Sequence, residues 1–269
     1  MGSKLSKARC PISNKSKAVI VPQDIINEIL DHLASDFRSL RACTLISKPW
    51  VQPCQRHLFH TARFTSVRAN QWLRIFPVRE GSPAHYVKEI RLEIGSIRHE
   101  FFECMPWFTD VDEIYLGGHF GGVPLGSGRS SPSEEPSFWK LPRSATSLTI
   151  STTVIALVQV RDIMAQLPNL DSLALSASIS DVVGRRGIGT VLKGRFGGKL
   201  MLRGPGEGIA NMLLEIPSGL HFTELEVYCP ETPLPSSVIR LAGACRETLV
   251  KLSHIVPYHC KSYNLSGCF

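Results

Sequence analysis

VKEIRL (residues 87–92) and VDEIYL (residues 111–116) share the pattern that sets the fold of most of this chain. In both hexads an apolar residue precedes two polar residues, a second apolar residue, a variable residue and a last apolar residue. The pattern recurs as ATSLTI, LDSLAL and FTELEV, and more weakly as GGKLML and LVKLSH, starting at residues 145, 170, 222, 197 and 249. Because successive side chains of a strand point to opposite faces, each hexad predicts a short strand with one apolar face.

The segments between the hexads have helical character. Successive hexads start 24, 34, 25, 27, 25 and 27 residues apart, and helical patterns cover residues 71–76, 154–167, 209–216 and 236–246. A helix between two strands returns the chain, so that the next strand lies parallel to the last. One such unit cannot cover its own apolar face, so neighbouring units stack into one core.

This spacing resembles that of leucine-rich repeats. We therefore predict an α/β fold for residues 65–269, an irregular leucine-rich-repeat-like solenoid with short parallel strands and helices. An ordinary α/β domain with similarly spaced strands is the alternative. The longest spacing holds a Gly- and Ser-rich insertion at residues 117–137, for which we predict a flexible loop. Such a loop is either a tolerated insertion or a surface that faces a substrate.

Residues 19–64, on the N-terminal side of the repeat, predict a module of three helices. Pro22 and Asp24 suit a first helical turn. Apolar residues then follow with the spacing of an amphipathic helix, namely Ile25, Ile26, Ile29, Leu30 and Leu33. A module this small is only marginally stable when alone, so we expect part of its apolar surface to face a partner.

Two further signals divide the module. Ser35 or Asp36 can cap a second helix, because a short polar side chain accepts hydrogen bonds from free backbone N–H groups. Pro53 argues against one continuous third helix, since proline lacks an N–H and clashes with the preceding turn. We therefore expect a turn over residues 48–52, followed by a short helix.

The module resembles an F-box, the motif that binds the Skp-type adaptor of SCF ubiquitin ligases. The matching residues stand in a fixed order: Val21, Pro22, Asp24, Ile25, Ile29, Leu30, Leu33, Asp36, Phe37, Ile46, Ser47, Lys48 and Trp50. The spacer from Asp36 to Trp50 is longer than in the common form, as in F-box proteins of basidiomycete fungi. The resemblance implies that a Skp-type subunit of a cullin-RING ligase contacts Pro22, Ile25, Ile29, Leu30, Leu33, Phe37 and Trp50. The alternative is an ordinary three-helix cap on the following domain.

Charge and apolar content narrow the class of protein. The net charge is +7, but five of the basic residues lie in the leader at residues 1–18, which we expect to be basic and disordered. The remaining 25 basic and 23 acidic residues nearly balance, so the folded part is not predicted to bind nucleic acid. No apolar run approaches the length of a membrane-spanning helix. The eight cysteines form no Cys-x-x-Cys pair and are expected to be free thiols in a cytoplasmic or nuclear protein.

Motifs for catalysis, cofactors and metals are weak or missing in the sequence. No nucleophile elbow, His-Glu-x-x-His motif or paired carboxylates stand out, so we predict that the chain is not an enzyme and has no cofactor. Cys54, His57 and His60 have metal-like spacing, but a structural zinc site needs a fourth ligand, and no metal is predicted. Gly2 fits a myristoylation pattern, which leaves membrane contact through the N-terminus as a minor alternative.

The sequence thus predicts a non-catalytic substrate-recognition adaptor of an SCF-type ubiquitin ligase, which acts in ubiquitin-dependent protein degradation. The F-box-like module would dock on the Skp-type subunit, and the repeat would present a protein substrate that the sequence does not identify. The rival is a repeat scaffold for protein–protein interaction whose helices only cap the solenoid. The last repeat unit lacks a polar cap, so we expect either a truncated C-terminus or a tail without structure.

Overall fold

A computed structural model describes residues 21–94, 97–118, 140–180, 192, 196–204, 206–216, 219–229 and 233–256 of the 269-residue chain. The chain divides into two compact units, Met1–Cys54 and Gln55–Phe269. We call them the helical unit and the sheet unit. The division comes earlier than residue 64, where the sequence pattern placed it: it falls within the helix at residues 48–58, and residues 61–64 form a strand of the sheet.

The helical unit is built from α1 (Gln23–His32), α2 (Phe37–Cys43) and the first part of α3 (Lys48–Leu58). Ile26 and Leu30 lie one turn apart on α1 and are fully buried, as is Leu40 on α2. Asp36 is the cap of α2, and its carboxylate accepts hydrogen bonds from the backbone N–H groups of Arg38 and Ser39, both at 3.1 Å. These bonds satisfy free backbone N–H groups in the first turn of α2 and fix where that helix begins.

The turn predicted over residues 48–52 was wrong, because α3 is continuous from Lys48 to Leu58 with Pro53 inside it. Proline removes one backbone hydrogen bond, and here the lost partner would be the carbonyl four residues earlier, in the first turn of the helix. That turn is tightened, since the N–H of Trp50 donates to Ser47 O, three residues back, at 3.0 Å. Trp50 and Cys54, also one turn apart, are both buried, and this burial offsets the missing bond.

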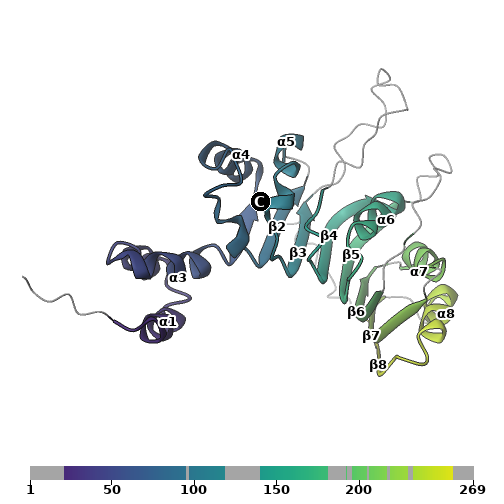
Figure 1. Cartoon of the computed structure of the whole chain (residues 1–269). Helices are drawn as coiled ribbons and strands as arrows, with labels where there is room; N and C mark the ends of the chain where they lie inside the picture. Colours follow the sequence, from purple (N-terminus) through teal and green to yellow (C-terminus); the bar gives the residue numbers. More distant parts are fainter. Residues whose placement is uncertain are drawn as a thin grey trace, which may run out of the picture. The chain divides into compact units, whose positions relative to one another are not determined.

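The sheet unit is built on one eight-stranded parallel sheet whose strands follow chain order (Figure 1). This arrangement confirms the α/β fold with parallel strands. The strands are β1 (Thr61–Phe64), β2 (Glu89–Ile94), β3 (Glu113–Gly118), β4 (Ser147–Ala156), β5 (Ser172–Ser180), β6 (Phe196–Arg203), β7 (Leu220–Tyr228) and β8 (Lys251–Ile255).

The last four residues of each of the seven hexads lie in a strand, and these residues pair in register. The fourth positions of the hexads form one row across the sheet: Ile90, Ile114, Leu148, Leu173, Leu200, Leu225 and Leu252. The sixth positions form a second row: Leu92, Leu116, Ile150, Leu175, Leu202, Val227 and His254. From β2 to β7 both rows are buried, so the repeat of the sequence is a repeat of the core.

The helices of this unit cover the face of the sheet that carries the two rows (Figure 1). They are α4 (Ser66–Ile75), η1 (Pro83–Tyr86), α5 (His99–Phe102), η2 (Met105–Trp107), α6 (Leu157–Ala165), α7 (Glu207–Leu214) and α8 (Ser236–Ala244). Parallel strands in chain order need crossovers of one hand, and these place every connection on the same face. Among the described residues, the other face of the sheet therefore carries no helix.

Two local features complete this core. At the first edge, the ring of Trp72 packs against Phe64 and Phe108, with centroids 5.4 and 5.5 Å apart. At β6, Gly198 has φ of +65° at a bulge in the pairing with β7. A Cβ atom on Gly198 would lie 1.9 Å from Asp171 O, so only glycine fits there.

Candidate binding surfaces

The helical unit exposes large apolar side chains. Ile25 and Ile29 lie one turn apart on α1 with 45% and 39% of their area exposed, and Phe37 begins α2 with 55% exposed. Leu45 and Ile46, in the link between α2 and α3, are 86% and 60% exposed. We call these five residues the apolar surface of the helical unit. Exposed apolar area gathered in so short a segment is typical of a protein-binding surface.

The residues that the F-box resemblance assigned to a partner have different positions. Pro22, like Ile25, Ile29 and Phe37, is exposed, and Leu33 is half-buried. Leu30 and Trp50 are buried inside the chain, so they are not free to contact a partner. Leu45 and Ile46 are available although the predicted contact set omitted both. Ile46 is a matching position of the motif that was not assigned to the partner, whereas only the apolar character of Leu45 in a polar link could have pointed to that residue.

Asp36 fixes the start of α2 next to this surface. Hydrogen bonds from the Ser39 hydroxyl, at 2.6 Å, and from the Ser39 backbone N–H hold the pKa of the Asp36 carboxyl below its usual value. The carboxylate is therefore ionised across the neutral range, and it also interacts favourably with the positive end of the helix dipole. Phe37 directly follows this cap, so the cap sets where its ring is displayed.

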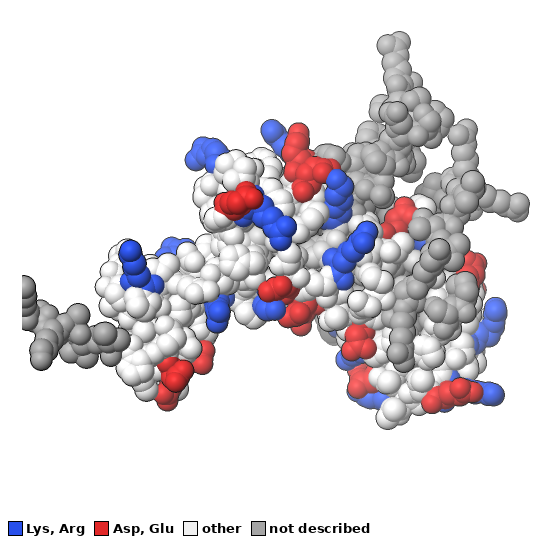
Figure 2. Space-filling model, in the orientation of Figure 1, with Lys and Arg blue, Asp and Glu red and all other residues white. Residues whose placement is uncertain are grey.

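The sheet unit presents a different surface, which we call the open face. It consists of the strand side chains that point away from the helices. At the β1–β3 end, the guanidinium of Arg63 pairs with Glu93, and that of Arg91 pairs with Glu89. The first pair joins β1 to β2, and the second lies within β2. Together they leave this end of the open face nearly neutral. Figure 2 shows the same mixture of signs on the side of the molecule that it displays, without one large patch of either charge.

At the β6–β8 end the open face holds a cluster of four charges: Lys199, Glu224, Glu226 and Lys251. The Glu226 carboxylate lies 3.1 Å from Lys199 Nζ and 3.4 Å from Lys251 Nζ. Glu226 is only 8% exposed. The Lys199 contact, together with that of Lys251, lowers the pKa of Glu226 against the opposing effect of desolvation. The cluster links three strands and is structural in character.

Small side chains fill the open face between these charged ends. We call them the hydroxyl strip, and they are Ser147, Thr149 and Ser151 on β4 with Ser172, Ala174 and Ser176 on β5. All six are half-buried. Hydroxyl groups both donate and accept hydrogen bonds, and short side chains let another backbone approach closely. The strip is therefore suited to contact an extended chain.

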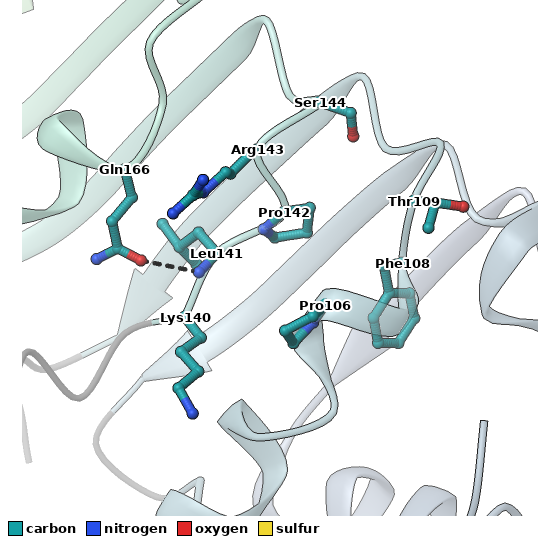
Figure 3. Close-up of a pocket in the computed structure, with 9 residues that line it drawn as sticks. All are labelled: Pro106, Phe108, Thr109, Lys140, Leu141, Pro142, Arg143, Ser144 and Gln166. Carbon is teal, nitrogen blue, oxygen red and sulfur yellow. Dashed lines mark hydrogen bonds between the residues drawn. The ribbon is translucent and has the colours of Figure 1, made fainter.

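A cavity of about 560 Å³ lies on the other side of β3 and β4, near their first residues. Figure 3 shows its lining, in which Gln166 Oε1 accepts a hydrogen bond from the Leu141 N–H at 3.0 Å. The Lys140 ammonium pairs with Glu103, whereas Arg143 extends from the turn before β4. The described lining holds no carboxylate, histidine or cysteine, and its polar contacts come from Thr109, Ser144, Gln166 and the two cationic side chains.

Cysteine and histidine side chains form no metal-type site in the part of the chain that the structure describes. No cluster of three or more metal-ligating residues is found there, including around Cys54, His57 and His60. The described cysteines are free thiols, and burial raises the pKa of Cys104 to about 12. The described helices include none that is long and apolar enough to cross a membrane.

Several predicted features lie outside the described residues: the leader with Gly2, most of the 117–137 insertion, and the chain after residue 256. In comparisons with known proteins, no family model, curated protein or solved structure matches this chain. Its function must therefore be inferred from its own residues and from the two surfaces, one apolar and one polar.

Proposed function

We propose that this chain is a non-catalytic substrate-recognition adaptor of an SCF-type ubiquitin ligase. The F-box-like module would dock on a Skp-type subunit, and the sheet unit would present a protein substrate as a leucine-rich-repeat-like solenoid. One observation carries the proposal: the helices that resemble an F-box expose Ile25, Ile29 and Phe37. The reaction itself would belong to the ligase, and the adaptor would act by holding the substrate near it in the cytoplasm or nucleus.

The energetics of the apolar surface support docking. Burying one exposed Ile, Leu or Phe side chain fully contributes about 1.5–3 kcal/mol. Part of the sum is lost to the entropy of association, so only a few well-packed anchors are needed for a stable complex. Leu45 and Ile46 extend the set of anchors beyond the residues that the resemblance assigned to the partner, and Pro22 starts the surface at the beginning of α1.

The buried motif positions have a different role in this proposal. Leu30 and Trp50 form part of the core of the chain and keep the helices in place. Asp36 caps α2 and thereby positions Phe37. The motif therefore combines two kinds of residue, those that hold the module together and those that contact the partner.

Co-purification with a Skp-type subunit tests the proposal. We expect the wild-type chain to co-elute with it, and an Ile25→Ala/Ile29→Ala variant to lose the complex while keeping its thermal stability. Ile239→Ala is the matched control, because Ile239 is 57% exposed on α8 and lies outside the module. This control should bind like the wild type.

Equal binding by the Ile25→Ala/Ile29→Ala variant and the wild type would contradict the docking role. So would failure of the wild-type chain to bind. The rival function, in which the helices only cap the solenoid, would then be favoured. That rival predicts a further result: removal of residues 1–60 makes the sheet unit insoluble, whereas an independent docking module can be removed without that loss.

A further inference from the structure

The ion pairs on the open face leave two charges without a partner among the described residues. Each of the other cations on this face pairs with a carboxylate of the same face: Arg63, Arg91, Lys199 and Lys251. Arg203, at the end of β6, has no carboxylate partner in the part of the chain that the structure describes. Glu113, at the start of β3, has no cation partner there. Both side chains are exposed.

Arg203 is held in position without a carboxylate partner among the described residues. Its guanidinium carbon lies 4.7 Å from the centroid of the Tyr228 ring, a cation–π contact. The backbone just after it is fixed as well, because the Gly204 N–H donates to Tyr228 O at 3.0 Å. Stacking on a ring orders a guanidinium but leaves the N–H donors at its edge free to bind an anion. Arg203 is therefore prepared to accept a carboxylate from outside the chain.

A tyrosine also lies on the β3 side of the hydroxyl strip. Tyr115 is two residues after Glu113 and 37% exposed. Its ring lies over Gly117, where a Cβ atom would be only 2.8 Å from Tyr115 Cε1. Gly117 does not have a positive φ, so the close neighbour of an added Cβ is the Tyr115 ring and the backbone is unstrained. The ring thus lies along its own strand and borders the hydroxyl strip.

The register of the sheet fixes the spacing between the two unpaired charges. Arg203 on β6 is in register with Ser176 on β5, Ser151 on β4 and Gly117 on β3. Since Gly117 is four residues after Glu113, Arg203 lies three strands across and four residues along from Glu113. With strands about 4.8 Å apart and a rise of about 3.3 Å per residue, the separation is about 20 Å. An extended peptide spans this distance in about six residues. The hydroxyl strip lies between the two ends.

We propose that the open face binds an extended segment of a protein partner that carries one basic and one acidic side chain about six residues apart. The basic group pairs with Glu113 and the carboxylate pairs with Arg203. The backbone between them crosses the hydroxyl strip, where serine and threonine hydroxyls bond its polar groups. This inference rests on the proposed function, because it names the chemistry of the substrate segment that the sheet unit would present.

Fluorescence anisotropy of the full chain with labelled synthetic peptides tests this inference. The peptides carry one Lys and one Glu in a Ser/Ala background. About two, five or eight residues stand between the two charged residues, and the middle value places them about six positions apart, as the estimated span requires. We expect the middle spacing to bind tightest. Arg203→Ala and Glu113→Ala should each weaken that peptide about tenfold or more, since each removes one charge-assisted contact.

A charge reversal sharpens the test. Arg203→Glu should reject the Lys…Glu peptide and accept a Lys…Lys peptide of the same spacing. Arg240→Ala is the matched control, because Arg240 is an exposed arginine on α8, which packs on the other face of the sheet. It removes the same charge and should leave the affinity unchanged.

Three results would overturn the inference: equal affinity at all three spacings, equal loss in Arg203→Ala and Arg240→Ala, or binding only when phosphoserine replaces Glu. Failure here is separable from failure of the proposed function. A chain that co-purifies with a Skp-type subunit but binds none of these peptides refutes only the inference. A chain that binds the peptides but no Skp-type subunit refutes only the ligase role.

Discussion

Ile29 on α1 and Ile114 on β3 are the same residue type in opposite surroundings, since Ile29 is 39% exposed and Ile114 is 1% exposed. The helical unit has too few elements to cover all of its apolar side chains, so some remain at its surface. In the sheet unit, each repeat covers the next, and the same residue type forms a continuous core. The exposed apolar residues of the helical unit are thus available for binding, whereas the buried apolar residues of the sheet unit serve its stability.

The largest difference between the units should appear on truncation of these apolar side chains. Leu148 is fully buried in the middle of the sheet, so Leu148→Ala should cost about 2–5 kcal/mol in the free energy of unfolding. Ile29→Ala should stay within about 0.5 kcal/mol of the wild type, as for other surface substitutions. Urea unfolding followed by circular dichroism measures both. Similar losses in the two variants would show that the helical unit also depends on its exposed residues.

A second prediction concerns the bulge at β6, where one strand of the sheet departs from the regular repeat. Gly198→Ala should destabilise the sheet by more than the roughly 1 kcal/mol that an unfavourable φ alone costs, because the new Cβ meets the Asp171 carbonyl. Gly81→Ala is the control, since Gly81 also has a positive φ but no atom within 4 Å of the added Cβ. If thermal melting gave equal losses for both variants, the bulge at β6 would be able to relax.

The same contrast explains what the sequence could predict. The hexads were sufficient to locate β2 to β8, because apolar residues at fixed alternate positions have one geometric solution in a parallel sheet. They missed β1, whose four residues Thr61–Phe64 contain only two apolar side chains in alternation and lack the start of the hexad. Periodicity therefore located the units that repeat and missed the one that begins the series.

The candidate sites were less predictable. The motif positions in the helical unit were identified, but the sequence could not separate Ile29, which is exposed, from Leu30, which is buried. That division depends on how the helices pack. Arg203 and Glu113 could not be selected either, because whether a charge is paired depends on strand register. Pro53 misled the prediction, since the burial of Trp50 outweighed a local preference of the backbone.

A smaller effect is expected on the stability of the sheet unit at low pH. The Glu226 pKa is lowered by Lys199 and Lys251, so the folded state holds its proton less tightly than the unfolded state does. The stabilisation is present above the unfolded value, near pH 4, and is lost as the pH falls through the folded pKa. We expect Glu226→Gln to lower the melting temperature at pH 7 and to flatten the decline below pH 5. An unchanged acid dependence in the variant would assign that decline to other carboxylates, such as Asp36 in the helical unit.

The smallest effect on the fold is expected from thiol labelling, which compares the two units without a mutation. Cys104 in the sheet unit is 1% exposed, its thiol donates to Phe101 O at 2.9 Å, and burial raises its pKa to about 12. Cys43 in the helical unit is only half-buried. Because the thiolate is the reactive form, iodoacetamide at pH 8 should modify Cys43 first and Cys104 only after unfolding, as mass spectrometry of peptides would show. Equal rates in the native protein would mean that the sheet core opens as readily as the surface of the helical unit, and the contrast between a binding unit and a stable unit would no longer hold.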